Sequence, residues 1–299
     1  MLILIYYKYI YNSYIDQINM FNTKIKLYEI IITIIILLFL NHCKNDYCKK
    51  SSFTPIKASE YDVKKLKEKH KNNIIIDYIT TKDGNKIMYS LYNSSKQPKW
   101  TDKITFYCHG NTNWIGNCIE KSHIELLKGY TVLLIDYRSF GISTGDISET
   151  GLYLDVLTMW NYMINTKNVK ISDVILFGNS LGTSLVSYLA YTLKMNKRKI
   201  PKHIILTSPF YNFYTISKDL VKGLGSVNNY NFPTNKFLNY IHKDTNIYYI
   251  HSINDGYIDI YHSYKLNRES PGKLLKIDGL HSNLTFTNEV KELIDTILN

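Results

Sequence analysis

Hydrophobic and polar positions divide this chain of 299 residues into three parts. Residues 25–40 are almost continuously apolar, whereas residues 44–73 are polar and rich in lysine. From residue 74 onward, apolar runs as short as buried strands alternate with stretches in which apolar residues recur at helical spacing. We therefore expect an N-terminal segment over residues 1–43, a linker over 44–73 and a folded domain over 74–299.

The predicted elements of the folded domain alternate between strands and helices. A β-hairpin is expected first, because two runs rich in β-branched and aromatic residues flank the turn at 82–85. Strands are expected at 74–80, 86–92, 103–108, 131–135, 174–177, 203–207, 247–251 and 273–277. Helices are expected near 59–70 in the linker and, in the domain, at 114–128, 149–165, 258–267, after residue 180 and from about residue 283. This alternation predicts an α/β domain with a mostly parallel central sheet and helices on both faces.

The apolar run at 25–40 is the main feature of the N-terminal segment. It is shorter than the roughly 20 residues of a comfortable membrane span, but Lys26 and Glu29 lie near one end, where their charges can reach the membrane surface. We favour an uncleaved single-pass membrane anchor over a signal peptide or a buried helix, because no small-residue cleavage site follows cleanly. Lysines flank both ends, so the positive-inside rule does not assign the side on which the domain lies.

Two of the four cysteines, Cys43 and Cys48, come soon after this run and lie beside lysines. Cysteines next to a membrane span are candidates for palmitoylation, and ordinary free thiols are the alternative. The other two, Cys108 and Cys118, fall in a predicted strand and a predicted helix. The spacing of the four fits neither a zinc site nor a disulfide framework, and we expect no metal and no organic cofactor.

The formal net charge of +11 limits the classes of partner. The lysines form no single stripe with interleaved aromatic residues, which argues against nucleic-acid binding. A positively charged chain is attracted to an anionic membrane surface, which agrees with a membrane anchor. Neither charge nor composition indicates an oligomeric state.

The stretch Gly178–Gly182 carries the strongest local signal for chemistry. It fits the pattern G-x-S-x-G, follows the apolar run at 174–177 and precedes apolar residues at helical spacing. Strand, sharp turn and helix are the context of a nucleophile elbow, which would lift Ser180 above the sheet. Side chains two residues before and two after the serine would collide, so both positions are glycine. The helix that starts here would favour a developing anion.

Five short sequence motifs occur in a specific order along the chain. They are His109–Asn111, Asp136–Ser143, Gly178–Gly182, Asn254–Asp255 and Gly279–His281. Over about residues 74–299 this order resembles that of serine hydrolases of the α/β-hydrolase fold, most of all the membrane-anchored "alpha/beta hydrolase domain-containing" group. That group includes acyl-protein thioesterases and lipid esterases. The resemblance implies an α/β-hydrolase fold and an acylated substrate, either a lipid or an acyl-protein.

A serine hydroxyl needs a neighbouring base and an orienting carboxylate to act as a nucleophile at neutral pH. In the fold that the chain resembles, an acid and then a histidine follow the serine, each on a loop at the carboxyl end of a strand. His281 lies between the last predicted strand and the last predicted helix, and we expect it to be the base. Asp255 comes soon after the strand at 247–251 and is the expected acid, with Asp259 as its rival.

Two backbone N–H groups are expected to hold the developing oxyanion. Leu181, the residue after the serine, supplies one of them. The other should come from Asn111 or Thr112, and Asn111 is favoured because it follows His109 and Gly110 as the donor does in the resembled family. His109 itself is expected to stabilise its loop rather than to act as a base.

Residues 209–245 lie where this fold carries its lid. The segment is short and contains prolines and glycines, so we expect irregular structure and a short lid that leaves the site open to bulky acyl substrates. Its aromatic side chains either line an acyl groove or pack at the edge of the core. They are Phe210, Tyr211, Phe213, Tyr214, Phe232 and Phe237.

Together these residues predict a membrane-associated serine hydrolase. It would cleave acyl esters or thioesters through the triad Ser180, His281 and Asp255 and an acyl-enzyme intermediate. The main alternative is a non-catalytic binding or scaffold protein on the same fold, which would require a broken triad. A membrane-associated structural protein would leave the order of the motifs unexplained.

Overall fold

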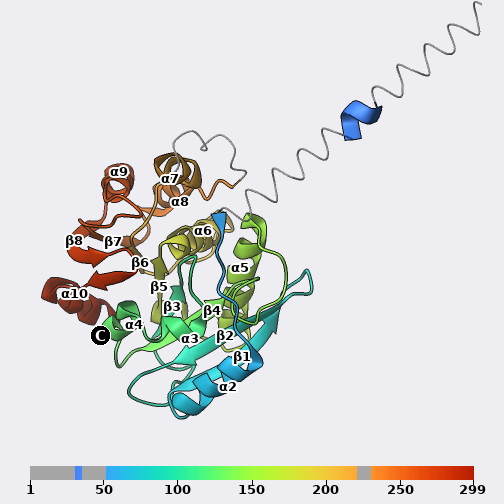
Figure 1. Cartoon of the computed structure of the whole chain (residues 1–299). Helices are drawn as coiled ribbons and strands as arrows, with labels where there is room; N and C mark the ends of the chain where they lie inside the picture. The colour runs from blue at the N-terminus through green and yellow to red at the C-terminus, as the bar shows by residue number, and fades with distance from the viewer. Residues whose placement is uncertain (1–30, 36–51, 221–229) are drawn as a thin grey trace, which may run out of the picture. The chain divides into compact units, whose positions relative to one another are not determined.

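The computed structural model describes residues 31–35, 52–220 and 230–299 (Figure 1). The chain divides into two compact units, Met1–Lys50 and Ser51–Asn299. Of the first unit, only five helical and exposed residues are described. The architecture below is therefore that of the second unit.

The predicted membrane anchor at 25–40 lies mostly outside the described residues, as do Cys43 and Cys48. In the ranges that the structure describes, no helix has both the length and the apolar character needed to cross a membrane.

A nine-stranded sheet forms the centre of the second unit. Its strands are β1 (Ile74–Thr80), β2 (Lys86–Tyr92), β3 (Ile104–Cys108), β4 (Thr131–Asp136), β5 (Val174–Asn179), β6 (His203–Thr207), β7 (Asn246–Ser252), β8 (Lys273–Leu280) and β9 (Asn283–Thr285). Their order across the sheet is β1-β2-β4-β3-β5-β6-β7-β8-β9. Neighbours from β4 to β8 in this order are parallel, whereas β1, β2 and β9 pair in the antiparallel sense. The predicted mostly parallel sheet is confirmed.

Helices cover both faces of this sheet, as the alternation of elements predicted. One apolar layer receives buried residues from α5 (Glu149–Asn165), α6 (Leu181–Met195), α7 (Phe213–Leu220), α8 (Thr234–Ile241) and α9 (Tyr261–Glu269). The other receives them from α2 (Glu60–Lys69), α3 (Ile115–Cys118), α4 (Ser122–Leu126) and α10 (Asn288–Leu298).

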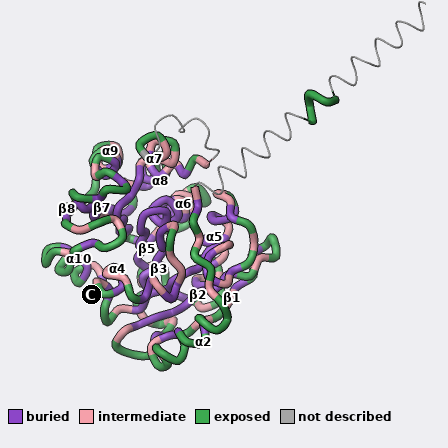
Figure 2. The backbone as a smooth tube through the Cα atoms, viewed as in Figure 1, coloured by how far each residue is buried: buried purple, intermediate pink, exposed green. Residues whose placement is uncertain are grey.

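Alternate residues of each central strand enter opposite layers, because successive side chains of a strand point to opposite faces. In β3, Phe106 joins the first layer and Tyr107 the second. In β5, Leu176 and Phe177 divide in the same way. Figure 2 shows the result, with buried backbone through the central strands and exposed backbone along the outer helices. The carboxyl ends of the parallel strands are thereby fixed on a rigid frame.

The described part of the lysine-rich segment packs onto the domain. Phe53 is buried, and Lys57 forms a β-bridge with Gly141. Ser59 then caps α2, since its side chain accepts a hydrogen bond from the Asp62 N–H while the Asp62 carboxylate accepts one from the Ser59 N–H. Residues 52–58 thus form a strap along the domain surface ahead of the first predicted strand.

Two predicted helices differ from the structure, and one strand was not predicted. The predicted helix at 114–128 is two short helices, α3 and α4, separated by a turn at 119–121. The last helix begins at Asn288 rather than near residue 283. Residues 283–285 instead form β9, which folds back against the end of β8. A strand of three residues carries too little local pattern to be predicted, because its stability comes from pairing with a neighbour.

The described parts of the segment 209–245, which are residues 209–220 and 230–245, are more regular than predicted, since they contain α7 and α8. Pro233 does not break the chain into a loop; it stands directly before α8, where its missing N–H would have no helical partner. Phe237, Leu238 and Ile241 then lie on the buried side of α8, in the same apolar layer as α6. The helical spacing of these three residues is the signal that the prolines and glycines obscured.

Candidate active site

Ser180 stands on a sharp turn between β5 and α6. Its backbone angles are φ 51° and ψ −115°, a left-handed conformation that a residue with a side chain rarely adopts. The turn is held by the Ser180 N–H, which donates to the Thr207 carbonyl at 3.0 Å, and by the Thr183 hydroxyl, which donates to the Ser180 carbonyl at 2.6 Å. The strand, turn and helix required of a nucleophile elbow are present.

The two glycines of this turn allow β5, β3 and α6 to approach one another. A Cβ atom on Gly178 would lie 2.6 Å from the Gly182 carbonyl oxygen and from the Thr183 Cα. A Cβ atom on Gly182 would lie 1.9 Å from the carbonyl oxygen of Cys108. All of these neighbours are backbone atoms, so neither position accepts a side chain unless the helix moves away from the sheet.

Gly182→Ala is therefore expected to lower the free energy of unfolding by at least about 3 kcal/mol, because the methyl group overlaps backbone of β3 that cannot swing aside. The measurement is denaturant unfolding of both proteins. Gly256→Ala is the matched control, since a Cβ there meets nothing within 4 Å, and it should change stability by less than about 0.5 kcal/mol. Equal stability of the two variants would contradict this account of the elbow.

The structure brings Ser180, His281 and Asp255 together at the carboxyl edge of the sheet. The Ser180 hydroxyl donates to His281 Nε2 at 3.1 Å, and His281 Nδ1–H donates to Asp255 Oδ2 at 2.8 Å. The serine follows β5, the aspartate follows β7, and the histidine lies in the turn between β8 and β9. The serine and the carboxylate are buried, whereas the imidazole remains 22% exposed.

The surroundings of Asp255 keep it ionised. Its Oδ1 accepts hydrogen bonds from the Tyr257 N–H at 3.0 Å and the Ile258 N–H at 2.9 Å. Burial opposes the charged form, but hydrogen bonds from His251 and His281 and the charge of His281 outweigh it and hold the pKa of Asp255 well below its usual range. Asp259 accepts a hydrogen bond from the Tyr261 N–H at 2.7 Å, whereas the hydrogen bonds of the His281 ring in the described structure go to Asp255 and Ser180.

A second histidine, His251, supports the same carboxylate. Its Nε2 lies 3.4 Å from Asp255 Oδ2 and donates to the Ile258 carbonyl at 2.9 Å, while its Nδ1 accepts from the Ser263 hydroxyl at 2.6 Å. The side chain is fully buried. The sequence analysis assigned His251 only to a strand and did not predict this contact. The one feature that could have indicated it is that a histidine ends an otherwise apolar run.

The structure also places both predicted oxyanion donors close to Ser180. Leu181 is the first residue of α6, so no preceding helical turn pairs its backbone N–H. Asn111 lines the same pocket as Ser180. Its side chain holds the strap, since Nδ2 donates to the Ser52 carbonyl at 3.0 Å and Oδ1 accepts from the Thr54 N–H at 3.4 Å. The loop that carries Asn111 is thus fastened to the segment that precedes α2.

His109 fastens this loop from the other side. The imidazole is fully buried, its Nδ1–H donates to the Gly110 carbonyl at 2.7 Å, and its Nε2 lies 3.3 Å from Asp136 Oδ1. Asp136 also accepts from the Ile115 N–H at 2.8 Å, and burial raises the pKa of this aspartate against the influence of His109. These contacts agree with a loop-stabilising His109 and do not bring it to Ser180.

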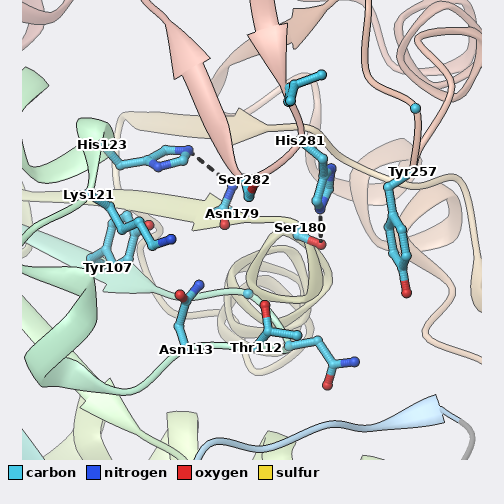
Figure 3. A pocket seen from close by; sticks show the side chains of 14 residues that line it. Tyr107, Thr112, Asn113, Lys121, His123, Asn179, Ser180, Tyr257, His281 and Ser282 are labelled. Atoms are coloured by element: carbon cyan, nitrogen blue, oxygen red, sulfur yellow. Dashed lines mark hydrogen bonds between the residues drawn. The ribbon is translucent and has the colours of Figure 1, made fainter.

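A cavity of about 460 Å³ opens beside Ser180, lined by residues that include Asn111, Tyr257 and His281 (Figure 3). None of the six aromatic residues at 210–237 that were considered for an acyl groove lines it, among the residues that the structure describes. Most of them pack instead; Phe232, for example, is fully buried and contacts Phe213. In the described part of the chain, no group of three or more His, Cys, Asp or Glu side chains is placed to hold a metal ion.

His123, which lines this cavity, is expected to make stability depend on pH. Burial, followed by the charges of His281 and Lys121, lowers the pKa of His123 to about 3. A histidine in the unfolded chain has an ordinary pKa of about 6.5. Below that pH the unfolded chain binds a proton at this histidine that the folded protein does not bind. The free energy of unfolding therefore falls as the pH drops from about 6.5 towards 3, by up to about 1.4 kcal/mol per pH unit.

His123→Gln should flatten this slope, because glutamine offers an acceptor to Asn179 but does not titrate. The measurement is the unfolding free energy of both proteins at pH 7, 5 and 4. Other buried histidines are common to both proteins and cancel in the difference. Parallel pH curves would show that His123 is not kept neutral by the fold.

A strained serine between strand and helix, an imidazole and a carboxylate in line with it, and a mostly parallel sheet beneath them define the α/β-hydrolase class. A model of the alpha/beta hydrolase fold family matches residues 106–231. An uncharacterized protein of Acanthamoeba polyphaga mimivirus is 32% identical over 202 residues, which cover 61% of this chain and 68% of the relative. The chain belongs to the α/β-hydrolase fold family.

Two further similarities extend this comparison. Lysophosphatidylserine lipase ABHD12 of Bos taurus is 34% identical over 116 residues, which are 36% of this chain and 27% of the lipase. The crystal structure of an alpha-beta hydrolase from Vibrio vulnificus superposes with a TM-score of 0.69 at 19% identity and covers 87% of this chain and 94% of its own. An esterase of Pyrococcus furiosus has a TM-score of 0.59 at 18% identity, with coverage of 82% and 97%. These structures share the fold.

Proposed function

We propose that this protein is a serine hydrolase that cleaves acyl esters or thioesters. The observation that carries the proposal is the chain of hydrogen bonds from the Ser180 hydroxyl through His281 to Asp255. His281 Nε2 is the acceptor of the serine proton, and its Nδ1–H faces a carboxylate that stays charged. This is the arrangement in which a weakly nucleophilic hydroxyl becomes reactive at neutral pH.

The reaction then follows from the geometry. Ser180 Oγ attacks the acyl carbonyl while His281 takes its proton, and the carbonyl electrons move onto an oxyanion held by the N–H groups of Leu181 and Asn111. His281 returns the proton to the leaving alcohol or thiol as the carbon–heteroatom bond breaks. Water, activated by the same imidazole, attacks the acyl-enzyme and releases the acid. Asp255 orients His281 and stabilises its charged form.

Lipids and acyl-proteins are the substrates we propose, at a membrane. The support is the apolar run at 25–40 and the net charge of +11 in the sequence, together with the open cavity beside Ser180. Similarity to a lysophosphatidylserine lipase adds weight to a lipid substrate. The N-terminal run would tether the domain close to such a substrate.

A fluorophosphonate probe tests the proposal directly, because it phosphonylates only a serine that a neighbouring base activates. The wild-type protein should be labelled at Ser180 and should hydrolyse members of a panel of acyl esters and thioesters. Peptide mapping of the adduct identifies the labelled residue. An unlabelled protein without turnover would favour a non-catalytic binding or scaffold role on the same fold.

A further inference from the structure

One end of the cavity beside Ser180 carries hydrogen-bond donors and a positive charge. It is formed by Lys121, Tyr107, His123 and Asn113, which we call the donor end. Figure 3 shows Lys121, His123 and Tyr107 grouped together, with Tyr257 across Ser180 from them in this view. None of the cavity-lining residues that the structure describes is aspartate or glutamate. The triad leaves this end of the cavity unused.

Two of the donor groups, the Tyr107 hydroxyl and one ring N–H of His123, belong to buried side chains and are unpaired among the described residues. Tyr107 is 2% exposed and His123 4%. His123 Nε2 accepts from Asn179 Nδ2 at 3.1 Å, which puts the ring proton on Nδ1. Within the described residues, neither this N–H nor the Tyr107 hydroxyl has a hydrogen-bond partner, and neither is among the fully enclosed unpaired atoms, so both are reachable from the cavity. Buried donors are normally paired, which points to a ligand group here.

Lys121 supplies the charge. It lies in the turn between α3 and α4, is half-buried and lines the cavity. Among the residues that the structure describes, no carboxylate lies within ion-pairing distance of its ammonium group, whereas Lys128, two residues after the end of α4, pairs with Glu125 at 3.3 Å. Its neighbour His123 stays neutral, so it donates a hydrogen bond beside the ammonium without adding a second charge.

We propose that the donor end binds an anionic group of the substrate, a phosphate or a carboxylate, while the acyl carbonyl lies at Ser180. This inference rests on the proposed function. Lys121 neutralises the charge, and Tyr107, His123 and Asn113 donate to the anion's oxygens. Charge-assisted hydrogen bonds in a partly buried site are the strong ones, so this end selects acyl substrates that carry a negative charge over neutral ones of the same shape.

Matched substrate pairs test the selection by kcat/KM. In the first pair, oleoyl glycerol phosphate carries a phosphate on the alcohol side of the ester, and oleoyl glycerol lacks it. In the second pair, nitrophenyl hydrogen glutarate carries a carboxylate on the acyl side, and nitrophenyl valerate has a methyl group in its place. In at least one pair the wild type should favour the anionic member by about tenfold or more. The pair that responds identifies the side of the ester that lies at the donor end.

Lys121→Met keeps the length of the side chain and removes the charge. It should lower kcat/KM for the anionic member by about ten- to a hundredfold and leave the neutral member within about twofold. Lys121→Arg should restore most of the preference. Lys128→Met removes a charge next to the same short helix but outside the cavity, and should alter neither member. Loss of activity on both members alike, or no loss, would overturn the proposal.

A binding measurement separates this proposal from catalysis. Ser180→Ala should bind the octyl ether of glycerol phosphate, which cannot be cleaved, about tenfold or more tightly than the octyl ether of glycerol in calorimetric titration. Tyr107→Phe in the same background should narrow the difference several-fold. Equal affinities for the two ethers, with no preference in either ester pair, would refute the donor end even if the wild type is an active hydrolase. An inactive wild type that still binds the phosphate selectively would instead refute the proposed function alone.

Discussion

Ser180→Ala is expected to lower kcat for ester hydrolysis by about four to six orders of magnitude and to abolish fluorophosphonate labelling. The reason is that no other hydroxyl is placed to act as the nucleophile, because among the described residues only Ser180 donates a hydrogen bond to His281 Nε2. The oxyanion donors and the cavity remain, so a weak residual rate above that in water should persist. Folding should be unchanged, since removing one hydroxyl from the strained turn breaks no bond within the core.

Ser187→Ala is the matched control for this variant. Ser187 lies on α6 below the elbow, and its hydroxyl donates to the Thr183 carbonyl at 2.6 Å, away from the imidazole. The control should keep kcat within about twofold and retain labelling, apart from a small change in stability. If both variants lost activity equally, the effect would come from the helix and not from the nucleophile. If Ser180→Ala kept full activity, the triad assignment would be wrong.

Asp255→Asn is expected to reduce kcat by about four orders of magnitude, with little change in KM. An amide cannot stabilise the imidazolium that forms when His281 takes the serine proton. Its NH₂ group would also face Nδ1 and favour the wrong tautomer, so that Nε2 would no longer accept from Ser180. Steady-state kinetics and labelling rate are the measurements.

Asp259→Asn provides the comparison, because Asp259 was the rival acid in the sequence. Its carboxylate caps the chain at the Tyr261 N–H, a bond that asparagine also makes. Activity should therefore stay within about threefold of the wild type. The opposite ranking of the two variants would move the acid from Asp255 to Asp259 and require the loop after β7 to rearrange.

The sequence by itself determined strands β1 to β8, most of the helices and the position of the elbow, whereas Asp255 and His281 were predicted with the help of the resemblance to a known fold. The strands, the helices and the elbow follow from local rules. Apolar spacing distinguishes a strand from a helix, and the glycines around Ser180 report a close approach that only glycine permits. The order of the serine, acid and histidine, which the resembled fold supplied, can be recognised in a sequence without its three-dimensional structure.

Tertiary structure alone brought three further side chains to the site, those of His251, Lys121 and Tyr107. His251 belongs to a strand by its pattern, and only the turn after β7 brings it to Asp255. Lys121 and Tyr107 are far from Ser180 in sequence and carry no motif. They reach it because β3 lies next to β5 in the sheet, and because α3 and α4 follow the loop after β3.

The physical reason is that local pattern fixes which face of an element is buried but not which elements become neighbours. Strand β9 shows this in its simplest form, since its three residues are a strand only because β8 pairs with them. The predicted base, His281, consequently lies in a hairpin turn and not in a strand-to-helix loop. The three residues of the proposed triad were predicted from the elbow motif and from the resembled fold, whereas the groups around them were brought there by the packing of the sheet.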